Sequence, residues 1–103
     1  MIKELTKKDF HFFIGKGDSI VDFHAEWCGP CKIMEPHFKK AADKLKDIKF
    51  GKVDVDDEYE LASKFQVMSI PTTIFFKEGE VVDRHTGAMT ADMIDRKAKE
   101  AFS

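Results

Sequence analysis

The sequence predicts an α/β domain in which a central mixed sheet carries helices on both faces, and three features of the chain lead to this expectation. A continuous apolar run over residues 19–25, broken by Asp22, is typical of a strand covered on both faces. Apolar residues then recur at helical spacing from Met34 to Leu45. Farther along, Glu78-Gly79 separates two strand-like segments and indicates an antiparallel hairpin. We expect one domain over residues 1–103, with the element order βαβαβαββα.

The first half of the chain should open with a short strand at residues 2–5. Thr6 and Asp9 are the expected capping pair of the first helix, which ends near Gly15. We assign three phenylalanines of this helix to the core: Phe10, Phe12 and Phe13. The strand over 19–25 follows, and then a long helix at residues 31–45. Pro36 lies inside that helix, and its missing N–H should produce a kink.

The second half should add a strand at residues 48–55 and a short helix at 58–65. A cluster of acidic residues around the junction of this strand and helix lacks the central glycine and terminal glutamate of a calcium loop, so we interpret it as helix-start residues. They are Asp54, Asp56, Asp57, Glu58 and Glu60. Strands at 72–76 and 80–86 form the hairpin. Thr90 caps a final helix, whose residues Met93, Ile94, Ala98 and Phe102 should face the sheet.

The only two cysteines of the chain, Cys28 and Cys31, lie where the strand over 19–25 gives way to the long helix. The helix start favours negative charge by roughly 0.3–1 kcal/mol when exposed and up to ~2 kcal/mol when partly buried. We therefore expect Cys28 to react as a thiolate, and Cys31, deeper and less exposed, to resolve the mixed disulfide. Pro30 suits the first helical turn, where no N–H is needed, and Gly29 leaves the backbone approachable.

Two other uses of a cysteine pair fit this sequence less well. A zinc site needs four ligands, and no histidine spacing completes one; the histidines are His11, His24, His37 and His85. A purely structural disulfide across two residues closes too small a loop to add much stability. The sequence therefore favours a redox-active disulfide, Cys28–Cys31, and implies neither a metal nor a separate cofactor.

Strand alternation places Ile20, Asp22 and His24 on one face, so that Asp22 points below the cysteine pair. Desolvation among apolar neighbours should raise the pKa of this carboxyl group. Two roles are open for Asp22. It carries the proton released by Cys31, or it is a polar residue satisfied by a backbone or lysine partner.

Four segments, in order along almost the whole chain, resemble the thioredoxin family. They are residues 22–32 (Asp-Phe-His-Ala-Glu-Trp-Cys-Gly-Pro-Cys-Lys), Pro36, residues 69–72 (Ser-Ile-Pro-Thr) and Gly87-Ala88. The resemblance implies the thioredoxin fold and general reduction of protein disulfides. It also implies a thioredoxin reductase as electron donor, fed by NADPH through a flavin or by ferredoxin.

The resemblance further implies roles for single residues. It favours the proton-carrier role for Asp22 and places Lys52 near that carboxylate, where it would tune the pKa; a surface lysine is the alternative. It implies a cis peptide bond before Pro71 in a loop that faces the cysteines, where the Ile70 backbone would pair with an extended substrate. The expected substrate groove consists of Trp27, Ile70, Pro71, Gly87 and Ala88.

One position departs from the family pattern, because bacterial thioredoxins often carry a large aromatic residue where this chain has His24. If the imidazole lies close to the sulfurs, its charged form would stabilise the Cys28 thiolate and make the protein more oxidising. If it points to solvent, it has no such effect. Both interpretations stay open from the sequence.

Composition narrows the range of partners. The 17 basic and 19 acidic residues give a net charge of −2, spread along the chain without a basic surface for nucleic acid. No apolar stretch suits a signal sequence or a membrane span, so we expect a cytoplasmic monomer. A disulfide oxidase or isomerase, a glutaredoxin and a binding subunit of a larger enzyme are alternative functions, and the Gly-Pro dipeptide argues against the oxidase or isomerase.

Overall fold

The computed structural model describes residues 1–103, and its elements follow the predicted order βαβαβαββα. The strands are β1 (Ile2–Glu4), β2 (Asp18–His24), β3 (Lys49–Asp54), β4 (Thr72–Lys77) and β5 (Glu80–Thr86). The helices are α1 (Phe10–Ile14), α2 (Gly29–Lys44), α3 (Tyr59–Lys64) and α4 (Ala91–Ala101). None of these helices combines the length and the apolar character that crossing a membrane requires.

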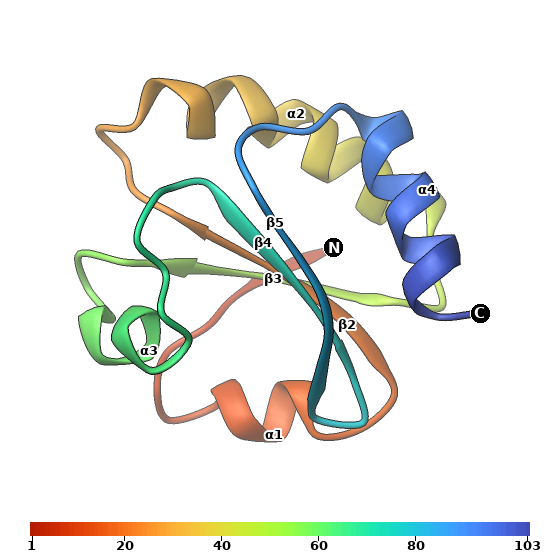
Figure 1. Ribbon diagram of the computed structural model, residues 1–103, viewed down its shortest axis with the longest axis horizontal. Coiled ribbons are helices and arrows are strands. Elements are labelled where there is room, and N and C mark those ends of the chain that lie inside the picture. Colours follow the sequence, from red (N-terminus) through yellow and green to blue (C-terminus); the bar gives the residue numbers. More distant parts are fainter.

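The five strands form one mixed sheet in the order β1-β3-β2-β4-β5, with β2 at the centre. β3 pairs in parallel with both β1 and β2, whereas β4 runs antiparallel to β2 and β5. Helices α2 and α4 cover one face of the sheet, and α1 and α3 lie on the other (Figure 1). The predicted hairpin at Glu78-Gly79 is confirmed, and both of its residues have positive φ.

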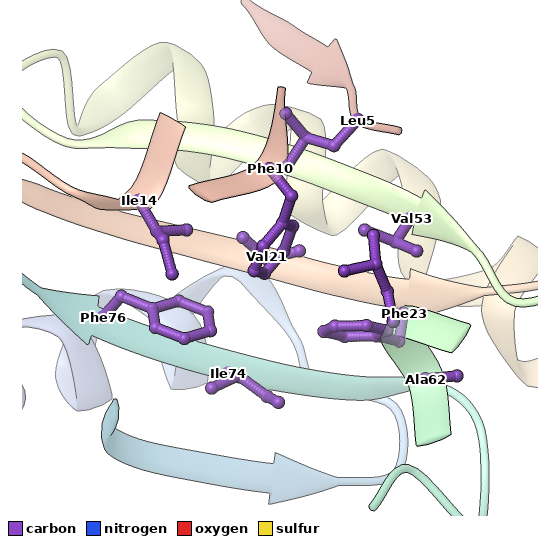
Figure 2. Packing of buried hydrophobic residues seen from close by; sticks show 10 residues of the cluster. Leu5, Phe10, Ile14, Val21, Phe23, Val53, Ala62, Ile74 and Phe76 are labelled. Atoms are coloured by element: carbon purple, nitrogen blue, oxygen red, sulfur yellow. The ribbon is translucent and has the colours of Figure 1, made fainter. Parts of the chain in front are cut away.

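Alternation along β2 divides its side chains between two apolar clusters. Val21 and Phe23 pack with Phe10 and other residues of the α1 and α3 side (Figure 2). Ile20 belongs to the second cluster, which holds residues of α2 and α4. Because Asp22 lies two residues from Ile20, it points to the α2 side of the sheet, as the sequence predicts. The central strand thus directs a carboxylate toward the helix that carries the cysteines.

The predicted pairing of Thr6 with Asp9 is present in the turn just before α1. The Asp9 carboxylate accepts the Thr6 N–H at 2.8 Å, and the Thr6 hydroxyl accepts the Lys8 N–H. Asp9 directly precedes the helix and makes no side-chain cap to it. The core assignment of Phe12 is wrong, because its side chain is 90% exposed. Two residues along a helix turn a side chain by about 200°, so Phe12 lies opposite the fully buried Phe10.

The other helices differ from expectation mainly at their ends. Helix α2 starts at Gly29, two residues before the predicted start, and keeps Pro36 inside it. Thr90 caps α4 as predicted, with its side chain accepting the Met93 N–H. The inward assignment of Met93 is wrong, since it is 36% exposed, whereas Ile94 on the same helix is fully buried.

Two of the three phenylalanines of α1, one buried and one exposed, provide a test of the core. Phe10→Ala removes a ring that contacts Phe23, Phe65 and Phe76, so we expect it to lower the free energy of unfolding by about 3–5 kcal/mol. Phe12→Ala makes the same chemical change at an exposed position and should stay within about 0.5 kcal/mol of the parent. Chemical denaturation measures both, and equal losses would contradict this description of the core.

Candidate active site

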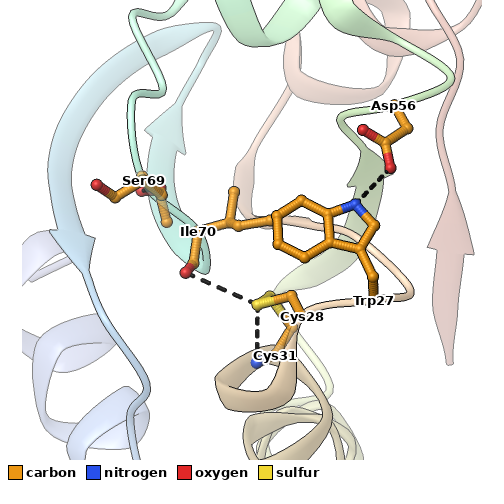
Figure 3. The surroundings of a disulfide bond; sticks show 7 residues. Trp27, Cys28, Cys31, Asp56, Ser69 and Ile70 are labelled. Carbon is orange, nitrogen blue, oxygen red and sulfur yellow. Dashed lines mark hydrogen bonds between the residues drawn. A yellow bond between two sulfur atoms is a disulfide. The ribbon is translucent and has the colours of Figure 1, made fainter.

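The cysteine pair lies between the C-terminal end of β2, the central strand of the sheet, and the start of α2. Cys28 is the N-cap residue of α2, and its Sγ atom accepts the backbone N–H of Cys31 at 3.3 Å. Pro30 occupies the first turn of the helix, as predicted. The two cysteines form a disulfide, with Cα atoms 5.3 Å apart (Figure 3). The helix therefore supplies a donor directly to the sulfur that was expected to be a thiolate.

The two sulfurs are buried to the same extent but open on different sides. Cys28 and Cys31 are 4% and 5% exposed, so the expectation that Cys31 is the less exposed of the two is wrong. Cys28 lines a groove of mainly apolar residues, whereas Cys31 lines a separate pocket of mainly charged residues. The two cysteines thus differ in which cavity they line, and sequence spacing does not reveal this difference.

The groove beside Cys28 has a volume of about 440 Å³. It is lined by Trp27, Cys28, Gly29, Pro30, Val55, Val67, Met68, Ser69 and Ile70. The carbonyl oxygen of Ile70 lies 3.8 Å from the Sγ atom of Cys28. The Ile70-Pro71 peptide bond is cis, which confirms the expectation drawn from the family resemblance.

Two hydrogen bonds hold the loop that contains this cis peptide bond. The Thr72 hydroxyl donates to the Ser69 carbonyl at 2.6 Å, and the Gly87 N–H donates to the Pro71 carbonyl at 2.8 Å. Gly87 has a φ of +110°, a conformation that favours glycine. The expected groove is therefore only partly present: Trp27 and Ile70 line it, whereas Pro71, Gly87 and Ala88 do not.

Trp27 forms the other side of the groove and is 70% exposed. Its indole N–H donates to the carboxylate of Asp56 at 2.7 Å, which fixes the ring beside Cys28 (Figure 3). The sequence reasoning missed this role of Asp56 and counted it only among the helix-start residues. Asp54 does not cap the helix either. Its carboxylate accepts the N–H groups of Asp56 and Asp57 in the turn before α3, and the N-cap residue Glu58 makes no side-chain cap.

Asp22 is 6% exposed, and its Oδ1 atom has no hydrogen-bond partner. Burial raises the pKa of Asp22 to about 7, the nearby Lys52 opposes this rise, and Glu35 adds to it. Lys52 pairs with Asp22 across β2 and β3, so the predicted neighbourhood of these two residues is present. No direct ion pair or hydrogen bond satisfies Oδ1, which argues against a purely structural role for the carboxylate.

The pocket beside Cys31 has a volume of about 420 Å³. It is lined by Glu4, His24, Ala25, Glu26, Cys31, Lys32, Glu35 and Lys52. His24 therefore lies on the Cys31 side, away from the groove onto which Cys28 opens. Neither interpretation of His24 from the sequence described this position. No group of three or more His, Cys, Asp or Glu side chains is arranged to hold a metal ion.

Comparison with known proteins identifies the family. The thioredoxin family model matches residues 1–100. The chain is a member of the thioredoxin family. It is 40% identical over 96 residues to the thioredoxin of Chlamydia caviae, covering 93% of this chain and 94% of that one. It is also 40% identical over 82 residues to the mitochondrial thioredoxin of Bos taurus, covering 79% of this chain and 49% of that one.

Solved structures agree with the thioredoxin fold. The crystal structure of the Malassezia sympodialis thioredoxin superimposes with a TM-score of 0.90 at 29% sequence identity, covering 99% of this chain and 94% of that one. Thioredoxins are protein-disulfide oxidoreductases that work by dithiol/disulfide exchange. The Cys28–Cys31 disulfide gives this member the redox pair that such exchange requires.

The buried carboxylate of this thioredoxin predicts a pH-dependent stability. Because the pKa of Asp22 is raised from 3.8 to about 7 on folding, the folded protein binds one more proton between these values. Its stability should fall as the pH rises through this window, by on the order of 4 kcal/mol in total. In Asp22→Asn this fall should be absent, whereas the exposed control Asp43→Asn should keep it. Denaturant titrations of the oxidised proteins at several pH values measure the slope, and identical slopes for Asp22→Asn and the parent would contradict the assignment.

The contact between Trp27 and Asp56 predicts a spectroscopic change, because Trp27 is the only tryptophan of the chain. Removing the acceptor in Asp56→Ala should free the indole ring. Acrylamide should then quench the fluorescence more strongly than in the parent. Asp57→Ala, the same substitution at the neighbouring exposed aspartate, should leave quenching unchanged. Equal quenching in all three proteins would show that the hydrogen bond does not hold the ring.

Proposed function

We propose that Cys28 is the nucleophile and Cys31 the resolving cysteine of a general protein disulfide reductase. This proposal rests on the hydrogen bond from the Cys31 N–H to the Cys28 Sγ atom at the start of α2. Charge on that sulfur is favoured by the donor and by the helix dipole together. The apolar groove next to Cys28 gives a protein substrate a surface on which to bind, whereas no such groove adjoins Cys31.

The reaction begins with the reduced protein. The Cys28 thiolate attacks one sulfur of the substrate disulfide, so that a mixed disulfide forms and the first substrate thiolate leaves. Cys31 then loses its proton, and its thiolate attacks the Cys28 sulfur. The Cys28–Cys31 disulfide forms, the mixed disulfide breaks and the second substrate thiolate leaves. The substrate gains two electrons, and the dithiol of the protein loses them.

Asp22 accepts the proton that Cys31 releases. An ordinary carboxyl group would hold a proton too weakly for this near neutral pH, but burial raises the pKa of Asp22 to about 7. Lys52 counteracts this rise and so tunes the value. A water molecule between Cys31 and Asp22 would complete the transfer, since the Oδ1 atom of Asp22 has no protein partner.

An extended substrate segment binds beside the cis-proline loop, where the Ile70 backbone pairs with it as an added strand. Trp27 and the Gly29-Pro30 turn support the segment around Cys28. Gly87 fixes Pro71 through its N–H, and Ala88 extends the surface at that end. Backbone pairing of this kind accepts many sequences, which suits a general reductant.

The oxidised protein is returned to the dithiol by a thioredoxin reductase, fed by NADPH through a flavin or by ferredoxin. No metal or separate cofactor takes part, because the disulfide itself carries the two electrons. We place the protein in the cytoplasm as a monomer. The bacterial relatives support this placement more than the mitochondrial ones do.

Cysteine variants test the two assigned roles. In the reduction of insulin by dithiothreitol, Cys28→Ser and Cys31→Ser should both lose the catalysed rate. With a single disulfide substrate, only Cys31→Ser should accumulate a stable mixed disulfide, because it keeps the nucleophile and lacks the resolving thiol. Mass spectrometry of the alkylated protein identifies the adduct. An adduct on Cys31 in Cys28→Ser, formed equally fast, would reverse the assignment, and an inactive parent would favour a non-catalytic binding subunit.

A further inference from the structure

Two buried polar atoms without partners lie on the same face of β2, on the side of Cys31. One is the Oδ1 atom of Asp22, and the other is the Nε2 atom of His24. Buried polar atoms without a protein partner are rare, and an ordered water or a transferred proton is a common reason for one. Two of them at alternate positions of one strand leave hydrogen-bonding capacity on this face that water can fill.

His24 lies where the buried strand reaches the polar pocket. Asp22 is almost fully buried, while His24, two residues closer to the strand end, is half-buried and lines the pocket together with Cys31. Lys52 and Glu35, which act on the Asp22 carboxylate, line the same pocket. His24 and Cys31 therefore line one polar pocket. Asp22 does not line it, but it lies beside Lys52, which does.

The charged groups around His24 come from every neighbouring element. Asp22 lies on the same strand, and Glu26 lies in the turn that follows it. Helix α2 contributes Lys32 and Glu35, and β1 contributes Glu4. Strand β3 contributes Lys52 and also Asp54, which pairs with His24. Carboxylates outnumber lysines in this set.

We propose that His24 is a proton relay that takes the Cys31 proton from Asp22 and passes it to the solvent of the polar pocket. Imidazole suits this step because one ring nitrogen accepts a proton while the other releases one. The receiving atom is Nε2, which is buried and has no partner, and bridging water would connect it to the Asp22 carboxyl group on the same face of β2. The proposal rests on the proton-carrier role of Asp22 given above.

The proton is conserved at each step. The Cys31 S–H bond breaks as the Asp22 carboxylate becomes a carboxylic acid, and the thiolate attacks the mixed disulfide. Asp22 then returns to the carboxylate as Nε2 of His24 takes the proton. The imidazole loses a proton to water in the pocket, which restores both groups for the next turnover. His24 touches no substrate atom, so it acts as a positioning and relay residue, through Asp22.

An aryl disulfide, dithiobis-nitrobenzoate, separates the two steps, because one coloured thiolate leaves when Cys28 attacks and a second when Cys31 resolves the adduct. We expect His24→Phe to leave the first phase unchanged and to slow the second roughly tenfold, less than the about 10²–10⁴ that a directly acting acid or base contributes. Phenylalanine keeps a flat ring, so packing alone is preserved. His85→Phe, at a half-buried histidine of β5, is the matched control and should leave both phases unchanged.

Chemical rescue with imidazole distinguishes a proton-transfer role of His24 from a purely structural one. His24→Ala should show the same slow second phase, and added imidazole should restore at least half of the lost rate while leaving His24→Phe unaffected. A second phase at the parent rate in His24→Phe would overturn the proposal, as would a loss in His24→Ala that imidazole does not restore.

Asp22→Asn distinguishes failure of the relay from failure of the proton-carrier role. If this variant and His24→Phe both leave the second phase unchanged, the proposed role of Asp22 is wrong and the relay falls with it. If Asp22→Asn slows the second phase and His24→Phe does not, only the relay is wrong. If both slow it and imidazole rescues His24→Ala, the relay is supported.

Discussion

The hydrogen bond from the Cys31 N–H to the Cys28 Sγ atom depends on where β2 ends and α2 begins. Because Cys28 is the N-cap residue, its sulfur takes the place that a serine or aspartate oxygen takes in other helices. The same short turn keeps Cys31 in the first helical turn, within disulfide distance of its partner. The central position of β2 in the sheet holds this junction in place, so the pair is attached to a largely buried strand.

Burial on the α2 side of β2 creates a second condition for the chemistry. Most of that face is apolar, and Ile20 packs there with residues of α2 and α4. Asp22 occupies the next position on the same face, where burial raises its pKa to about 7. The stability of the folded protein above neutral pH is thereby reduced. A carboxylate that costs stability at this place is more easily explained by a role in proton transfer than by packing.

Much of this arrangement could be predicted from the chain alone, because it depends on local pattern. Alternation along residues 19–25 placed Asp22 correctly, and the change from an apolar run to helical spacing placed the cysteines at a helix start. The exposure of Phe12 follows from helical periodicity relative to Phe10 and could have been predicted, whereas that of Met93 depends on how α4 is rotated against the sheet. The contact between Trp27 and Asp56 joins positions far apart in the sequence, and nothing in the acidic run marks which carboxylate meets the indole. The side on which each sulfur opens likewise follows from the packing of loops around the junction.

The separation of the two openings has a consequence for how the protein works while a partner is bound. No residue lines both the apolar groove beside Cys28 and the polar pocket beside Cys31. A polypeptide lying over the groove therefore covers one sulfur without sealing the aqueous side of the other. Substrate binding and proton exchange with solvent thus take place on different sides of the disulfide. Groups beside Cys31 can therefore exchange protons with water while a substrate is still bound over Cys28.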